Sequence, residues 1–230
     1  MMHAWLVSFK ETIRFIDNHI LFYIFEPLCA GCKRYIQSTT DPLCSSCHRS
    51  IKPVVSITYQ LTATKNITVY AAGAYEGPLQ VMILAKRYHD IAMSLALAEI
   101  IKQYTPISSM QFDALVPIPL HWTRRAARGY NQAEEIAYYL SKTLQIPVVH
   151  LLVRTRKTQL QLELDATERA TNLKNAFTIA KPAFSRIYQK KRLLLVDDLL
   201  TTGSTLTEAA KVLYTLNPIE IKAVVGARTI

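Results

Sequence analysis

The chain has 230 residues, half of them hydrophobic, which suits one medium-sized domain with a small additional segment. It has no apolar run of about 18 residues, which excludes a membrane-spanning helix, and charged residues interrupt the apolar N-terminus, which lacks a signal-peptide layout. We therefore expect a cytoplasmic location. Lys and Arg outnumber Asp and Glu by 27 to 17, and this net charge of +10 favours a nucleic acid, a polyphosphate or a membrane surface as partner, with a solvated basic surface as the alternative.

Apolar residues recur at helical spacing near the N-terminus, from Leu6 to Ile24. This pattern predicts an amphipathic helix, which we assign to residues 1–25 as a separate segment. Packing against the body of the protein is the favoured role, and contact with a membrane or a partner is the alternative.

Four cysteines, the only ones in the chain, form two C-x-x-C pairs: Cys29 with Cys32, and Cys44 with Cys47. Two such pairs can supply four thiolates to a tetrahedral Zn²⁺. We therefore expect a zinc ribbon over residues 26–52, too small to hold a core without metal. Disulfides and a redox pair are the less favoured alternatives.

Residues 53–75 have β-like composition and predict two short strands. Gly77 and Pro78 should open a helix, since proline suits a first turn. Residues 91–104 predict a second, mostly buried helix, and residues 112–119 predict a buried strand.

A basic loop follows that strand over residues 121–130, and a helix is expected from Asn131 or Gln132 to Leu144. The loop contains Arg124, Arg125 and Arg128, and the end of a central strand is where α/β folds bind ligands. A solvated loop is the alternative. Trp122 and Tyr130 lie among these arginines and are candidates for stacking on bases, or for simple packing.

The chain then predicts a strand at 148–153, a polar segment at 154–169 suited to a lid, and a short strand or turn at 172–179. A last strand is expected at 219–227. Strands that alternate with helices predict an α/β fold with a mainly parallel sheet.

The stretch LLLVDDLLTTGST, residues 193–205, combines a buried strand, an acidic pair, a turn rich in hydroxyls and the start of a helix. A turn that leads into a helix presents N–H groups and the positive end of the dipole, which suits a phosphate. Asp197 and Asp198 would repel a phosphate, but carboxylates accept hydrogen bonds from a sugar diol and hold Mg²⁺. The stretch therefore predicts a site for a ribose 5′-phosphate.

Residues 193–205 resemble the signature of type I phosphoribosyltransferases that binds 5-phosphoribosyl diphosphate (PRPP). By this resemblance Asp197 and Asp198 would bind the ribose hydroxyls. The residues that would bind the 5′-phosphate are Thr201, Thr202, Gly203, Ser204 and Thr205.

Further motifs extend the resemblance to the ComF/ComFC family of competence proteins, which is amidophosphoribosyltransferase-like. They are the two C-x-x-C pairs, LAKRYHD at 84–90, VPIPLHWTRRAARGYNQA at 116–133, LVRTRKTQLQL at 152–162 and ERATNLKNAF at 168–177. The resemblance implies a zinc ribbon followed by a phosphoribosyltransferase-like domain over residues 53–230.

The family implies a role in natural transformation, in which single-stranded DNA is taken up into the cytoplasm. It implies as partners a ComFA-type helicase and the uptake channel at the inner membrane, to which the protein would be peripheral. PRPP would bind with Mg²⁺, and catalytic transfer in nucleotide metabolism is the alternative function. Candidates for the diphosphate are the basic residues Lys86, Arg124, Arg128, Arg154 and Lys157. No side chain stands out as a catalytic base.

Overall fold

The computed structural model describes residues 28–38, 41–85, 91–120, 129–155, 176–181 and 186–230. The helices and strands follow the order α2 Ser45–Ser50, β1 Ile57–Gln60, β2 Asn66–Ala71, α3 Gly77–Leu84, α4 Ile91–Tyr104, β3 Ala114–Pro117, α6 Gln132–Leu144, β4 Leu152–Arg154, β5 Phe177–Ile179, β6 Arg192–Leu200, α9 Ser204–Leu213 and β7 Glu220–Arg228. Short 3-10 turns are η2 Pro106–Ser109, η3 Arg186–Tyr188 and η4 Tyr214–Leu216. The helix expected in residues 1–25 lies outside this part of the chain. None of the described helices is long and apolar enough to cross a bilayer.

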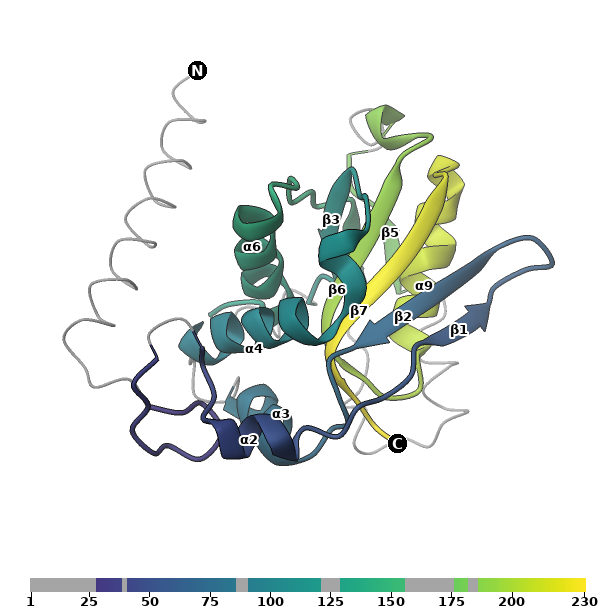
Figure 1. The fold of residues 1–230 in the computed structure, drawn as a ribbon. Helices are drawn as coiled ribbons and strands as arrows, with labels where there is room; N and C mark the ends of the chain where they lie inside the picture. Colours follow the sequence, from purple (N-terminus) through teal and green to yellow (C-terminus); the bar gives the residue numbers. More distant parts are fainter. Residues whose placement is uncertain (1–27, 39–40, 86–90, 121–128, 156–175, 182–185) are drawn as a thin grey trace, which may run out of the picture.

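The main sheet has five strands in the order β1-β2-β7-β6-β3 within the described residues (Figure 1). β2, β7, β6 and β3 run parallel, and β1 joins the edge as an antiparallel hairpin partner of β2. The predicted mainly parallel sheet is thus confirmed. Because the four parallel strands point the same way, the segments that follow β3, β6 and β7 leave from one edge, called here the carboxyl edge.

The two faces of the sheet are covered by different helices (Figure 1). Leu193 and Leu195 pack with α9 in one buried cluster, whereas Leu194 and Val196 pack with α3, α4 and α6 in another. This alternation is the period of two along a strand, and it explains why β6 is apolar at every position from Leu193 to Val196. The ribbon contributes Cys29 and other buried residues only to the cluster of α3, α4 and α6.

The strand expected at 148–153 is wrong in its extent. Val148 forms only an isolated bridge to Leu115, and the strand proper is Leu152–Arg154, paired with β5 in a separate two-stranded sheet. The backbone N–H of Val149 donates to Leu115 (2.8 Å) before the chain leaves the edge of the main sheet. The buried apolar residues Val149, Leu151 and Leu152 span both parts, so hydrophobicity alone could not divide them.

β6 is longer than its apolar run. It continues through the acidic pair to Leu200, because β7 is long enough to pair with Asp197 through Val225 and with Leu200 through Arg228. The acidic pair therefore lies inside the last part of a strand, which fixes its backbone more firmly than a loop would.

Candidate phosphate edge and metal centre

The acidic pair lies at the carboxyl edge in a half-buried position. Asp197 and Asp198 are both intermediate in exposure, although Leu193 to Val196 before them are fully buried. The backbone N–H of Asp198 donates to Oδ1 of Asp197 (2.9 Å), which orients that carboxylate. Two adjacent carboxylates on a rigid strand can accept hydrogen bonds from hydroxyls or bind a cation through oxygen.

The turn between β6 and α9 places its hydroxyls against the start of the helix. Gly203 has φ of 80°, a left-handed conformation that favours glycine, and no side chain caps the helix after it. The hydroxyls of Thr202 and Ser204 lie 2.8 Å apart. The first turn of α9 contains no acidic residue. An uncapped helix start without negative charge suits an anion.

Tyr59 of β1 lies directly against this turn. A Cβ at Gly203 would come 2.8 Å or less from ring and hydroxyl atoms of Tyr59, so residue 203 must be glycine for space as well as for conformation. Burial raises the pKa of Tyr59, although the charge of Arg228 opposes this. Tyr59 therefore supports the turn as a neutral phenol. No local pattern in the sequence indicated this role for Tyr59, since it is distant from Gly203 in the chain.

The start of α6 lies at the same edge but is closed by its own cap. Asn131 is 3% exposed, and its side chain donates to the carbonyl of Ile118 (2.9 Å) and accepts from the N–H of Ala133 (3.2 Å). The N–H groups of Glu134 and Glu135 also bond to Asn131, through its carbonyl. The pattern N-x-x-E at 131–134 is the signal that could have revealed this cap.

Most of the basic residues predicted to meet a diphosphate lie outside the described residues: Lys86, Arg124, Arg128 and Lys157. Arg154 is described and is 7% exposed, with its guanidinium 5.5 Å from the centre of the Phe177 ring. Tyr130 is 6% exposed, so its ring is packed inside and offers no surface for a base. Trp122 is outside the described part.

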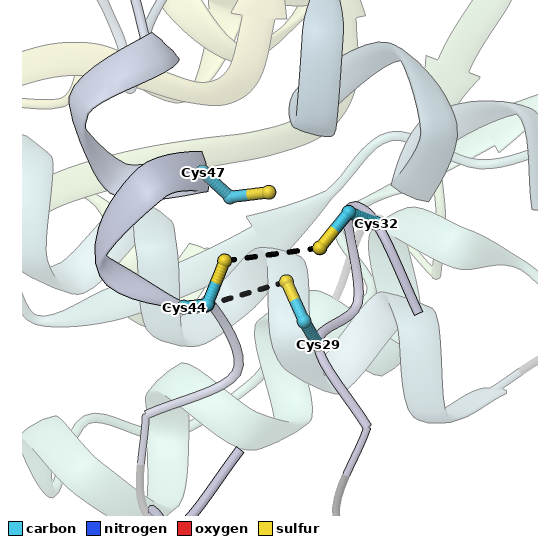
Figure 2. A group of neighbouring side chains, drawn as sticks. All are labelled: Cys29, Cys32, Cys44 and Cys47. Atoms are coloured by element: carbon cyan, nitrogen blue, oxygen red, sulfur yellow. Dashed lines mark hydrogen bonds between the residues drawn. The ribbon is translucent and has the colours of Figure 1, made fainter. Parts of the chain in front are cut away.

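The four cysteines converge, as Figure 2 shows, from the turn at 29–32 and the start of α2. All four Sγ atoms lie within 4.8 Å of one another, and those of Cys32 and Cys44 are 3.7 Å apart. Sulfurs bound to one tetrahedral zinc lie about 3.8 Å apart, given Zn–S bonds of about 2.3 Å. The donor set and its spacing therefore fit zinc, which these thiolates would hold as a structural ion.

The surroundings of the thiols also suit a metal. Burial opposes ionisation of Cys29, but hydrogen bonds from the backbone of Cys32, Cys44 and Gly31 lower its pKa to about 6. Burial, together with hydrogen bonds to the other three thiols, raises the pKa of Cys47. The cluster thus ionises only in part without a cation, and a divalent ion would supply the missing positive charge.

The ribbon is anchored to α4 through a polar chain. The ring of His48 has Nε2 2.6 Å from Asp41 and Nδ1 2.7 Å from the hydroxyl of Tyr104. Both ring nitrogens are thereby engaged away from the sulfurs, which agrees with a four-sulfur site. Gly31 lies so close to α3 that a Cβ there would be 2.7 Å from Cβ of Pro78.

Parts of this chain are similar to known proteins. A model of the phosphoribosyl transferase domain matches residues 126–229. Competence protein F of Haemophilus influenzae is 42% identical over 48% of this chain and 48% of its own length. DNA utilization protein YhgH of Escherichia coli O157:H7 is 32% identical over 60% and 62%. Competence protein ComFC of Bacillus subtilis is 32% identical over 43% and 37%. Each match spans less than two-thirds of the relative.

The parallel sheet, the acidic strand end and the turn at α9 define a phosphoribosyltransferase-type domain, and the domain match agrees. The relatives named for competence and for DNA utilization agree with the resemblance to the ComF family that the motifs indicated.

Proposed function

We propose that this chain acts in DNA uptake during competence and that its phosphoribosyltransferase-type domain binds PRPP with Mg²⁺. The relatives named for competence and for DNA utilization support the first part. The observation that carries the second part is the carboxyl edge of β6, where two half-buried carboxylates stand beside an uncapped helix start free of acidic residues. The two carboxylates suit a sugar diol and a cation, and the start of α9 suits a phosphate.

Different residues of the carboxyl edge would bind different parts of PRPP. Asp197 and Asp198 accept hydrogen bonds from the ribose hydroxyls, and residues 201–205 bind the 5′-phosphate. The basic candidates named from the sequence would meet the diphosphate, and Mg²⁺, when bound, would supply further positive charge there. If a transfer step follows, positive charge develops at ribose C1 as diphosphate leaves, and the nearby carboxylates stabilise it.

The test is a calorimetric titration of the full-length, zinc-loaded protein with PRPP and Mg²⁺. The wild type should bind, and the Asp197→Asn, Asp198→Asn variant should bind at least tenfold more weakly. Asp113→Asn is the matched control, because Asp113 lies at the other edge of the sheet, where it accepts from the N–H of Arg192 (2.7 Å). Equal affinity in the wild type and the double variant, or none in the wild type, would contradict PRPP binding.

Binding of single-stranded DNA is a second function that a separate surface favours. Arg186, Lys190, Lys191 and Arg192 are exposed and lie at the start of β6, at the edge opposite the acidic pair. DNA held there by its phosphates would leave the PRPP site open, so both functions fit one molecule. In the cytoplasm such a protein would pass DNA between an uptake channel at the inner membrane and a ComFA-type helicase.

DNA binding through this surface should weaken steeply with salt, because counterions are released from the phosphates. Replacing Lys190 and Lys191 with Gln should lower the affinity for a single-stranded oligonucleotide and reduce the salt slope by about 1.4, because each phosphate contact on a single strand contributes about 0.7. The Asp197→Asn, Asp198→Asn variant should bind the oligonucleotide like the wild type. A salt-independent affinity would argue against this surface.

A further inference from the structure

The start of α6 contains a buried side chain whose polar atoms lack partners. Gln132 is 5% exposed, and within the described part of the chain neither its amide nitrogen nor its amide oxygen makes a hydrogen bond. Buried amides are nearly always hydrogen-bonded, because they otherwise lose their bonds to water without replacement. An unpaired buried amide therefore points to a hydrogen-bonding group that the described residues do not supply.

Gln132 lies on the face of α6 that packs against the sheet. Ile136 and Leu140 follow it at intervals of four residues, and both are fully buried in the cluster that includes Leu194 and Val196 of β6. Residues at this spacing share one face of a helix. As the first residue of α6, Gln132 extends this apolar stripe to the carboxyl edge.

Two hydrogen bonds fix the distance of this helix start from β6. Asn131 donates to the carbonyl of Ile118, and the N–H of Ile118 donates to the carbonyl of Val196, the residue before the acidic pair. The start of α6, where Gln132 lies, is thus held beside the end of β3, the neighbour of β6 and its acidic pair.

The surroundings of Gln132 do not favour a phosphate. The N–H groups of Ala133, Glu134 and Glu135 all bond to Asn131. The carboxylates of Glu134 and Glu135 lie in the first turn and are themselves buried, which opposes an anion at this helix start. The group that remains for a ligand is a neutral amide, with donors on its nitrogen and an acceptor on its oxygen.

We propose that the Gln132 amide recognises a neutral edge with one N–H donor beside one acceptor, as a nucleobase or a primary carboxamide presents. An amide side chain makes two parallel hydrogen bonds with such an edge. This inference rests on the proposed function. The base or carboxamide that Gln132 recognises would be the acceptor molecule, which meets PRPP at the carboxyl edge of the sheet. Gln132 is then a specificity-determining residue for the acceptor and takes no part in holding PRPP.

The test uses the full-length, zinc-loaded protein saturated with PRPP and Mg²⁺. It is titrated separately with adenine, hypoxanthine, uracil, cytosine and glutamine, in the wild type and in Gln132→Met, which keeps the length of the side chain without its hydrogen bonds. At least one probe should bind the wild type tenfold or more tightly than the variant. PRPP affinity should stay within twofold, and the ligand-free variant should melt at the same temperature or higher, because an unpaired buried amide is removed.

The outcomes separate the two claims. A wild type that fails to bind PRPP contradicts the proposed function and, with it, this inference. Normal PRPP binding without any probe that distinguishes the variant overturns the inference alone. A variant that melts at a lower temperature assigns the amide to the fold, and one that binds PRPP tenfold more weakly assigns it to the diphosphate; both also overturn the inference. The probe that binds, a base or glutamine, identifies whether Gln132 recognises a nucleobase or a primary carboxamide.

Discussion

The starts of α9 and α6 lie at one edge of one sheet, yet their chemistry differs. α9 begins after a left-handed glycine, without a side-chain cap and without acidic residues in its first turn. α6 begins with a buried asparagine cap and two carboxylates in its first turn. The helix dipole is common to both, so the dipole alone does not make an anion site. The difference lies in how many of the first N–H groups already have acceptors. At α6 those of Ala133, Glu134 and Glu135 bond to Asn131, whereas at α9 the N–H of Ser204 makes one long bond to the hydroxyl of Thr202 (3.4 Å).

Removal of zinc should have the largest effect, and it should destabilise α6 more than α9. The ribbon shares its buried cluster with α4 and α6, whereas α9 packs on the other face of the sheet. Ribbon-like peptides bind structural zinc with about 10–16 kcal/mol, so a strong chelator should unfold the ribbon. Hydrogen exchange should then show loss of protection in residues 29–51 first, in α4 and α6 next, and least in α9. Added zinc should restore protection, and equal loss on both faces would contradict this division.

Gly203→Ala should disable the start of α9. Alanine at φ of 80° is strained, and its Cβ would overlap the ring of Tyr59, so we expect a loss of about 1–3 kcal/mol in the free energy of unfolding. PRPP affinity should fall at least tenfold, measured beside urea unfolding.

Combining Tyr59→Ala with Gly203→Ala separates the two causes of the lost stability, which are the backbone strain at residue 203 and the overlap with the ring of Tyr59. It removes the overlap but leaves the strain at residue 203, so stability should recover in part when the double variant is compared with Tyr59→Ala alone. Full additivity of the two changes would show that Tyr59 does not support the turn.

Asn131→Ala should have a smaller effect, confined to stability. It removes the cap of α6 and leaves the carbonyl of Ile118 without its partner, which should cost about 1–2 kcal/mol in unfolding free energy. PRPP affinity should remain within twofold of the wild type, by calorimetry. A tenfold loss of PRPP affinity with unchanged stability would place the ligand at the start of α6 and contradict the assignment of the phosphate to α9.

The sequence revealed the elements whose signals are local. Two C-x-x-C pairs predicted the cysteine cluster, and the order of apolar run, acidic pair, turn and helix predicted β6 and α9. These features are readable because each is contained in a few neighbouring residues.

Features that depend on distant pairing were not predictable. The extension of β6 through Asp197 depends on β7, and the role of Tyr59 depends on a hairpin that lies far from Gly203 in the chain. Gln132 reads from the sequence as an ordinary helix residue, because its missing partners appear only once burial is known. Long-range packing thus decided the details of the site, while local pattern decided its position.

The most direct test of the comparison is a titration with ribose 5-phosphate, followed through the backbone amide signals by nuclear magnetic resonance. A bound phosphate shifts the N–H groups that it contacts. We predict the largest shifts in residues 203–206 at the start of α9, and little change at Ala133, Glu134 and Glu135, whose N–H groups already have acceptors. Shifts centred on residues 133–135 instead would contradict the account.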